Sequence, residues 1–450
     1  MGEQTAAQAL TVAALDLVAG EQSVTTSEAV RRTLLDWFAV TIAGSIERLP
    51  QTLAQSLAAG GSSRLVGRGG SADPATAALV NGTAAHTLEL DDIYAPGLVH
   101  PGAPVVATAL AVGDMVDATG RRFEDAVVAG IEVAGRVARA LGPTHYRRWH
   151  TTGTAGALGS AMAAAYLLEL DSAATIHSIT LAATMAGGLQ QTFRRDSTGK
   201  PLHAGNAAHA GVIAALAAGG GIVGALDALE GESGLAAATG ADADWTICHD
   251  RSATVPVIEQ LTVKPYPCCG HTFAAIAAAL QLRDTGLQPD QVDTITVASY
   301  SAALDVAGNA DPQTPAAARF SLAYTVATAL TDGRLDQDSF EAARIADTRW
   351  RTLAERVSLE VGDQFEAAFP ARRGASVTIT TKNGDRVMRT VPDRPGSPEN
   401  PLSTDAITAK FTGLSAPVLG AANAARLQDQ LVEVAALRSV RNLACQPNGD

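Results

Sequence analysis

Three stretches of the sequence combine acids, histidines and cations in patterns that could move a proton or hold an anion. The first, residues 88–105, reads LELDDIYAPGLVHPGAPV and places Asp91 and Asp92 before a Tyr-Ala-Pro-Gly loop that leads to His100. A carboxylate beside an imidazole suits proton transfer near neutral pH. Acids and Pro-Gly are also ordinary turn residues, so this stretch alone favours a solvated turn.

The second stretch, residues 193–211, concentrates positive charge in an acidic protein. It reads FRRDSTGKPLHAGNAAHAG and contains Arg194, Arg195, Lys200 and His203. A loop of this kind that opens a helix can hold carboxylates through charge-assisted hydrogen bonds and helix N-terminal amides. On charge pattern alone, a solvated basic turn is an equally good interpretation.

The third stretch, VKPYPCCGHTFAAIAAAL, places Lys264, Tyr266 and His271 around a Pro-x-Pro turn that opens a helix. The positive end of a helix favours the neutral form of a histidine in its first turn, which suits a proton donor or acceptor. Cys268 or Cys269 could instead act with the histidine as a thiol nucleophile. Neither an oxyanion loop nor a third orienting group is evident, so this alternative ranks low.

Two further patterns carry less chemistry. Residues 219–224 match G-x-G-x-x-G, but an alanine-rich helix precedes them where a dinucleotide-binding motif needs a strand, so a helix end is predicted. His145 and His150 are five residues apart with Arg147 and Arg148 between them, an arrangement that favours a loop or helix edge packed by Trp149. With no H-x-x-x-H motif either, the sequence predicts no metal site.

Composition limits what can hold these residues. The chain has 450 residues, 47% hydrophobic and 18% charged, which allows two domains or one large domain with a lid. Aromatic residues make up only 4%, while alanine and glycine are abundant, which favours closely packed helices with small contact residues. The net charge of −13 argues against nucleic acid or an anionic membrane as the main partner.

Cysteine usage and the N-terminus favour a cytoplasmic protein. Four unevenly placed cysteines do not form a disulfide framework, which is typical of a reducing compartment. The N-terminal MGEQTAAQAL has no basic region before its apolar residues, so we expect no signal peptide. The longest charge-free runs are weakly hydrophobic and interrupted by glycine, which favours buried helices over membrane spans.

The elements that must position the three stretches change character along the chain. Residues 1–266 read as successive helices, such as SEAVRRTLLDWFAVTIAG, whose apolar residues recur at helical spacing. Residues 267–402 mix helices with alternating runs, and ASVTITTKNGDRVMRTV predicts a type I′ hairpin at Asn383-Gly384. Residues 403–450 return to helix. We therefore predict a mainly α fold: a multihelical domain built from both chain ends, with a smaller α+β lid domain inserted.

The three stretches also occur together, in this order, in a known family. The chain resembles the 2-methylcitrate dehydratase (MmgE/PrpD) family through LLDWFAVTIAG, NGTAAHTLELDD, HPGAPVVATALAVGD, RRWHTTGTAGALGSAMAAAYLL, GKPLHAGNAAHAG, LEGESGL, KPYPCCGHTFAAIAAAL and ARFSLAYTVATALTDG. The resemblance covers nearly the whole chain. It implies a helical domain with an α+β lid, a homodimer without metal or organic cofactor, and a reaction that breaks a bond next to a carboxylate.

The family motifs assign roles to residues of this chain. The resemblance implies that Lys200 anchors a substrate carboxylate and that acid and histidine residues transfer the proton. Ile93 stands where many members have threonine, and Glu89 where aspartate is frequent, so we expect a substrate other than cis-aconitate or 2-methylcitrate. The implied catalytic residues are Asp91, Asp92, His100 and His271, and the implied substrate-binding residues are Lys200, Arg194, Arg195, His203, His150 and Tyr266.

The leading hypothesis is a cofactor-independent lyase (hydro-lyase or decarboxylase) or epimerase acting on a carboxylate-bearing small molecule. A non-catalytic carboxylate-binding or scaffold protein that keeps the fold is the alternative, because Ile93 and Glu89 depart from the family pattern. A thiol hydrolase ranks third. The expected partners are the small-molecule substrate and a second copy of the chain, with no nucleic acid and no membrane.

Overall fold

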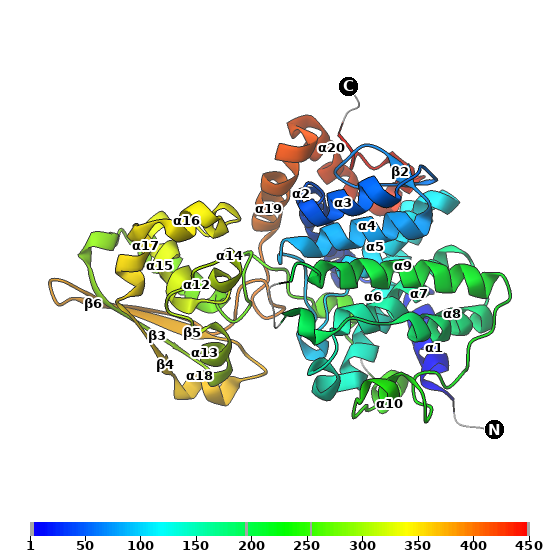
Figure 1. Cartoon of the computed structure of the whole chain (residues 1–450), viewed down its shortest axis with the longest axis horizontal. Coiled ribbons are helices and arrows are strands. Elements are labelled where there is room, and N and C mark those ends of the chain that lie inside the picture. The colour runs from blue at the N-terminus through cyan, green and yellow to red at the C-terminus, as the bar shows by residue number, and fades with distance from the viewer. Residues whose placement is uncertain (1–3, 194–196, 253, 448–450) are drawn as a thin grey trace. The chain divides into compact units, whose positions relative to one another are not determined.

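The fold is mainly α-helical with a small α+β part, as the sequence predicted (Figure 1). The computed structural model describes residues 4–193, 197–252 and 254–447. Among these residues, none of the helices combines the length and the apolar character that a bilayer crossing needs.

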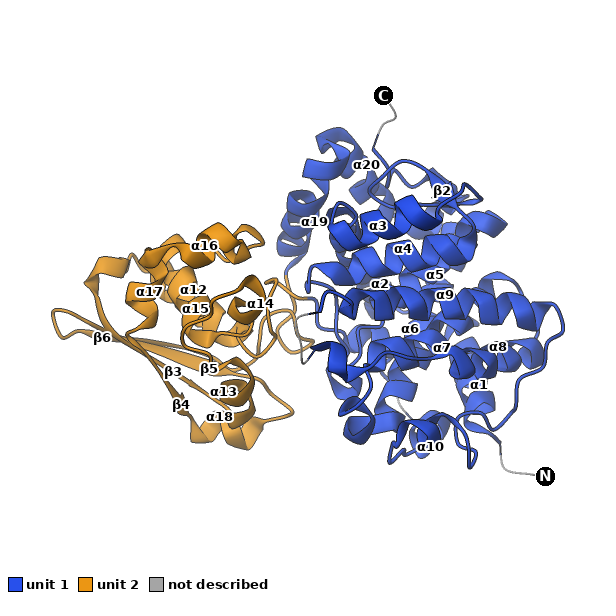
Figure 2. Cartoon of the chain, in the orientation of Figure 1, with its two compact units in different colours: residues 1–263, 403–450 blue, residues 264–402 orange. Residues whose placement is uncertain are grey.

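The chain divides into two compact units (Figure 2). Unit 1 joins both chain ends, Met1–Val263 and Ser403–Asp450, and unit 2 is the intervening segment Lys264–Leu402. Unit 1 contains the helices α1 (Ala6–Val18), α2 (Val24–Gly44), α3 (Arg48–Leu57), α4 (Pro74–Thr87), α5 (Gly102–Val116), α6 (Gly120–Tyr146), α7 (Thr151–Leu167), α8 (Ser172–Met185), α9 (Lys200–Gly219), α10 (Leu235–Thr239), α11 (Thr246–His249), α19 (Thr404–Leu419) and α20 (Ala421–Val432), with the short strands β1 (Ser63–Arg64) and β2 (Ser71–Ala72).

Helices of unit 1 approach one another closely because glycine lies where they touch. Between α6 and α7, a Cβ atom on Gly130 would lie 2.7 Å from the carbonyl oxygen of Gly159. Between α4 and α9, a Cβ atom on Gly205 would lie 2.4 Å from the carbonyl oxygen of Leu79. Any side chain at these positions would push the helices apart, and the helices concerned carry candidate site residues. The α9 helix ends at Gly219, as the glycine-rich run predicted.

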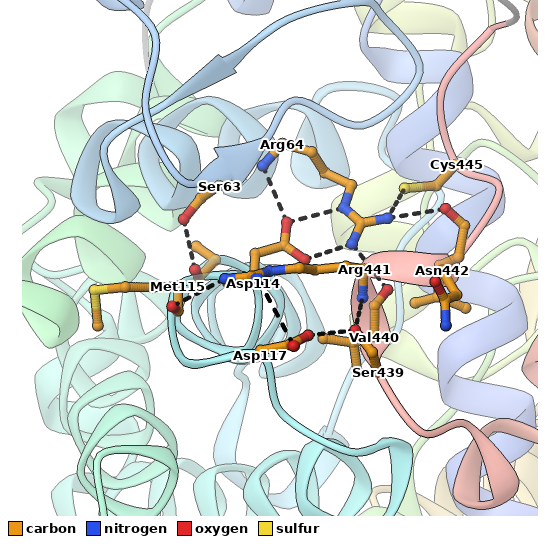
Figure 3. Close-up of polar contacts among 12 residues, drawn as sticks. Ser63, Arg64, Asp114, Met115, Asp117, Ser439, Val440, Arg441, Asn442 and Cys445 are labelled. Atoms are coloured by element: carbon orange, nitrogen blue, oxygen red, sulfur yellow. Dashed lines mark hydrogen bonds and ion pairs between the residues drawn. The ribbon is translucent and has the colours of Figure 1, made fainter.

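A partly buried arginine, Arg64, holds the C-terminal segment against the rest of unit 1 (Figure 3). The Arg64 guanidinium donates to the Asp114 carboxylate over 2.8 Å and to the carbonyl oxygens of Val440 and Leu443, each also over 2.8 Å. Its Nη1 group lies 3.7 Å from the Cys445 thiol. Buried charges that are paired and hydrogen-bonded in this way hold chain segments in place, although the net gain is modest.

A four-stranded mixed sheet forms the centre of unit 2. Its order is β4-β3-β5-β6, in which β3 pairs parallel with β4 and antiparallel with β5. The strands were predicted from alternating apolar residues. The alternation arises because one face of the sheet packs against α12 and α15 in a single core. The elements are α12 (Phe273–Asp284), β3 (Val292–Ser299), α13 (Ser301–Ala307), α14 (Pro315–Ala318), α15 (Leu322–Asp332), α16 (Ala342–Ala346), α17 (Thr348–Ala354), β4 (Val357–Val361), α18 (Asp363–Ala368), β5 (Ala375–Thr381) and β6 (Arg386–Val391).

The β5–β6 hairpin is confirmed, but its predicted turn type is wrong. A type I′ turn needs positive φ at both central residues, and Asn383 does not have it, whereas Gly384 has φ +88°. The Thr381 amide donates to the Asp385 carbonyl over 2.8 Å, which closes a three-residue loop. A left-handed glycine at the end of such a loop is the G1-bulge arrangement, so the Asn-Gly pair sits one position later in the turn than predicted.

Candidate active site

The segment after α4 reverses the chain and brings acids and histidines together inside unit 1. The α4 helix ends one residue after His86, and Glu89 then adopts φ +56°, a left-handed conformation that costs a non-glycine residue about 1 kcal/mol. Backbone hydrogen bonds of 3.0 and 2.9 Å then tie Ile93 to Thr262. The turn therefore buries both acids and directs Asp91 toward the histidines.

Asp91 is buried between two imidazoles. Its Oδ2 atom lies 2.7 Å from His86 Nδ1 and 3.3 Å from His100 Nδ1. Burial alone would raise the pKa of this carboxyl, but attraction to the two histidines outweighs burial and holds the pKa well below its usual range. An ionised carboxylate is therefore aligned with two rings, and each ring can receive or pass on a proton.

Asp92 contacts the start of a helix, unlike its neighbour Asp91. Its Oδ1 atom accepts a 3.1 Å hydrogen bond from the Gly102 amide at the start of α5. A Cβ atom on Gly102 would lie 2.3 Å from Asp92 Oδ2, so only glycine allows this approach. A carboxylate that satisfies the first amide of a helix stabilises the helix start. The structure therefore separates two adjacent acids that the sequence left equivalent.

Two more histidines extend the cluster. His150, at the start of α7, stacks on His86 with ring centroids 5.4 Å apart, and its Nδ1 lies 3.2 Å from Nδ1 of His203. Burial, followed by repulsion from neighbouring cationic groups, lowers the pKa of His150 well below its usual value, and the pKa of His203 falls for the same reasons. The neutral rings of His150 and His203 thus extend the group formed by His86, His100 and the ionised Asp91 carboxylate.

Lys200 begins α9 and forms an ion pair with Glu89. The side chains are only 18% and 27% exposed, so the pair is partly shielded from water. The Lys200 ammonium also lies 5.3 Å from the centre of the Phe193 ring, which in turn packs edge-on against His150. Lys200, the predicted carboxylate anchor, thus lies beside the histidine cluster and is already paired with the Glu89 carboxylate.

Three other sequence predictions for this part of the chain have separate outcomes. Arg194 and Arg195 lie outside the described residues. His145 is buried between the hydroxyls of Thr154, at 2.8 Å, and Thr239, at 3.1 Å, which is a packing role. Burial lowers its pKa to about 4.

In unit 2, His271 pairs with a tyrosine that no motif indicated. His271 Nδ1 lies 2.7 Å from the hydroxyl of Tyr300, at the end of β3. Burial, followed by the charges of Arg373 and Arg394, lowers the pKa of His271 to about 4. The expected neutral imidazole is therefore present, but the expected cause is wrong, because α12 begins only at Phe273 and His271 precedes the helix.

Two other residues of this stretch, Tyr266 and Cys268, lie in or against the core of unit 2. Tyr266 packs against the hydrophobic core of unit 2, with its ring centre 5.7 Å from that of Phe273. Cys268 is buried, and burial raises the pKa of its thiol to about 12. A thiol with so high a pKa holds almost no thiolate at neutral pH, which weighs against Cys268 as the nucleophile.

His86 is the main residue that the sequence interpretation missed. It lies within NGTAAHTLELDD, five residues before Asp91, so the signal was inside a motif already singled out. Facing ligand atoms of His86, Asp91 and His100 lie within 4.8 Å of one another. Two imidazoles and a carboxylate are a donor set that divalent transition metals accept. The spacing of these three residues along the chain matches no standard metal-binding motif.

Comparison with known proteins finds one family along most of the chain. The MmgE/PrpD N-terminal domain matches residues 8–248 and the MmgE/PrpD C-terminal domain matches residues 266–435. A cis-aconitate decarboxylase of Homo sapiens is 27% identical over 360 residues, covering 77% of this chain and 73% of the relative. A cis-aconitate decarboxylase of Aspergillus terreus is 22% identical over 420 residues, covering 85% and 83%.

Proposed function

The chain belongs to the MmgE/PrpD family and is a lyase, and from that premise we propose that it eliminates water or carbon dioxide from a carboxylate-bearing small molecule. The observation that carries the proposal is the Asp91 carboxylate held between His86 and His100, in a cluster that reaches Lys200. Both reactions need a cation for a carboxylate and a group that moves a proton at the neighbouring carbon.

Asp91 and His100 supply the proton-transfer pair in unit 1. The carboxylate faces Nδ1 of His100, which places the ring's other nitrogen, Nε2, on the far side. An ionised carboxylate behind an imidazole fixes its orientation and makes it a better base. A hydrogen bond of 3.1 Å from the His100 amide to Thr152 Oγ1 fixes the backbone beneath the ring. We propose that Asp92 stabilises the start of α5 and takes no part in proton transfer.

Lys200 provides the charge for a substrate carboxylate, and His203, in the first turn of α9, provides a neutral hydrogen-bonding ring beside it. Ile93 replaces the threonine hydroxyl common in the family, which supports a substrate other than cis-aconitate. The family pattern adds His271 of unit 2 as a second proton-transfer residue. Its 2.7 Å contact with the Tyr300 hydroxyl gives it a partner through which a proton can pass.

Turnover of a di- and tricarboxylate panel, which includes cis-aconitate and 2-methylcitrate, tests the proposal. With any accepted substrate, His100→Gln should lower kcat by about 10²- to 10⁴-fold, the usual contribution of general acid–base catalysis. His209→Gln is the matched control, since His209 lies on α9, where its Nδ1 is 3.2 Å from the Ala75 carbonyl oxygen. Full activity of both His100→Gln and Lys200→Gln would contradict the proposal. Dialysis against EDTA separates a metal-dependent reaction from the metal-free one expected.

A non-catalytic carboxylate-binding protein is the second candidate, and one observation favours it. Glu89 already forms an ion pair with Lys200, so the ammonium is neutralised before any substrate arrives. Calorimetry with the same panel distinguishes the two candidates. Saturable binding of a carboxylate with no turnover of any compound would support the binding protein and contradict the lyase.

We also propose that the protein is a homodimer whose contact includes α9. Exposed side chains recur along this helix at spacings of three and four residues, among them Leu202, Ile213 and Leu216, at 37, 39 and 41% exposure. Residues 201–226 contain no Asp, Glu, Lys or Arg, so two copies with net charge −13 can approach here without repulsion. Ile213→Asp should halve the mass measured by light scattering, whereas Val24→Asp, at an exposed site elsewhere, should not.

The cytoplasm is the proposed location. In the described part of the chain, no disulfide joins Cys248, Cys268, Cys269 or Cys445. Free thiols are typical of a reducing compartment.

A further inference from the structure

We propose that His86 is a positioning residue: it fixes the Asp91 carboxylate, and His100 is the ring beside that carboxylate that exchanges protons with the substrate. The inference rests on the proposed function, in which Asp91 and His100 form the proton-transfer pair. Both histidines face the same carboxylate oxygen, so residue type does not distinguish them. Their distances to that oxygen, their burial and their neighbours do.

The two histidines contact the shared oxygen unequally. His86 Nδ1 lies 2.7 Å from Asp91 Oδ2, the length of a charge-assisted hydrogen bond, whereas His100 Nδ1 lies 3.3 Å from it. The low pKa of Asp91 keeps the carboxyl ionised at neutral pH. Because an ionised carboxylate only accepts hydrogen bonds, the ring nitrogens that face it carry the protons. The shorter contact makes His86 the main donor to Asp91.

His86 is enclosed, and His100 is not. The His86 side chain is 0% exposed, and none of the described residues offers its second ring nitrogen, Nε2, a hydrogen-bond partner. A proton on Nε2 would be a buried donor without an acceptor, so the ring fits its place with the proton on Nδ1. The His100 side chain is 11% exposed, so this ring is the more accessible of the two.

Neighbouring rings hold His86 in this orientation. It stacks on His150 with planes 24° from parallel and meets His100 edge-on, with ring centroids 4.8 Å apart. A side chain locked by packing keeps a reacting group in a defined geometry. Titratable or charged groups near Asp91 come from α4 (His86), α7 (His150), α9 (Lys200, His203), α19 (Lys410, paired with Asp36 of α2) and the intervening loop (Glu89, Asp92, His100).

Sharing one oxygen between two donors limits how strongly Asp91 attracts a proton on His100. Without His86, the carboxylate would accept from His100 alone and would stabilise its cationic form more strongly. A general base that is already protonated cannot accept a proton from the substrate, so activity would begin only at a higher pH. His86 therefore keeps His100 available as a neutral base.

Turnover across pH of any substrate accepted from the di- and tricarboxylate panel tests this role. His86→Leu should lower kcat by about 10- to 100-fold, the factor that corresponds to one hydrogen bond to a charged group. KM should change by less than about twofold, because His86 does not touch the substrate. The fall of kcat/KM on the acid side should move to a higher pH.

Two conservative variants separate positioning from packing. His86→Asn should restore most of the rate and the original pH profile, because the asparagine amide nitrogen is bonded to Cγ, as Nδ1 is. His86→Gln places its nitrogen one bond farther out and should not. His145→Leu is the matched control, since His145 is equally buried and hydrogen-bonded on both ring nitrogens, and it should leave the pH profile unchanged. Equal losses in His86→Asn and His86→Leu without a change in pH profile would overturn the inference.

Nitrogen-15 NMR of the histidine rings in the wild type needs no substrate, and it remains decisive if thermal melting shows that His86→Leu does not fold. His86 should carry its proton on Nδ1 and none on Nε2 at neutral pH, with its signals identified by their loss in His86→Asn. A proton on Nε2 would overturn this inference and leave the proposed function standing. Full activity of His100→Gln would instead overturn the proton-transfer pair of the proposed function, whatever the NMR result.

Discussion

Removing the charge of Glu89 should make the protein bind carboxylates more tightly. Glu89 and Lys200 form an ion pair in which the side chains are 27% and 18% exposed. A substrate carboxylate at Lys200 must displace Glu89 or lie beside it. Two carboxylates about 4 Å apart repel by about 4 kcal/mol at an effective dielectric constant of about 20. Glu89→Gln removes this repulsion and keeps the size of the side chain.

Solvent screening reduces the expected gain in carboxylate binding, because the side chains of Glu89 and Lys200 are both partly exposed. A partly shielded charged hydrogen bond contributes about 1.5 to 3 kcal/mol and an exposed one less than about 1 kcal/mol. We therefore expect Glu89→Gln to gain about 1 to 2 kcal/mol in carboxylate binding, which corresponds to about a 5- to 30-fold lower Kd. Folding stability should fall by about 1 kcal/mol, since the variant loses the ion pair.

Glu169→Gln provides a matched control for the assay. Glu169 also adopts a left-handed backbone, with φ +55°, and its carboxylate lies 2.9 Å from Arg122, but the side chain is 74% exposed. Calorimetry with tricarballylate at low and at physiological salt should show the gain in Glu89→Gln only, and more strongly at low salt. A Glu89 variant that binds no tighter than the Glu169 variant would refute the reasoning.

Three further predictions concern stability. Burial opposes ionisation of Asp91, but its two histidine neighbours lower the pKa below that of the unfolded chain, so its stabilisation is present above about pH 4 and is lost as the pH falls further. In urea unfolding, Asp91→Asn should reduce the loss of unfolding free energy at acid pH. An unchanged pH dependence would contradict the ion pairing of Asp91 with the histidines. The pKa of His271 is about 4, chiefly through burial, so the unfolded chain takes up that proton first as pH falls from about 6.5, and stability drops through this window. His271→Gln should recover on the order of 2 to 3 kcal/mol at pH 4, and no recovery would argue against a neutral ring. Arg64→Ala leaves a buried acid without its cation and should cost about 3 to 5 kcal/mol of unfolding free energy, whereas Arg441→Ala, 47% exposed, should cost less; equal losses would contradict the burial argument.

Local periodicity explains why much of the fold could be predicted. Helical spacing in SEAVRRTLLDWFAVTIAG and alternation in QVDTITVASYS are properties of neighbouring residues, and both elements are present. The turn type at Asn383-Gly384 was mispredicted because a two-residue and a three-residue loop use the same residues. The choice between them depends on strand register, which is set by pairing along both strands.

Residue types and their order established which groups could do chemistry, but the tertiary structure decided which of them meet. Asp91 and Asp92 are adjacent and chemically identical, yet one faces two histidines and the other binds the start of α5. Glu89 and Lys200 are 111 residues apart, and only the packing of α4 against α9 brings them into contact. Tyr300 and Arg394 carried no local signal at all. Charge pairing and burial depend on distances through space, and a sequence pattern reports only distances along the chain.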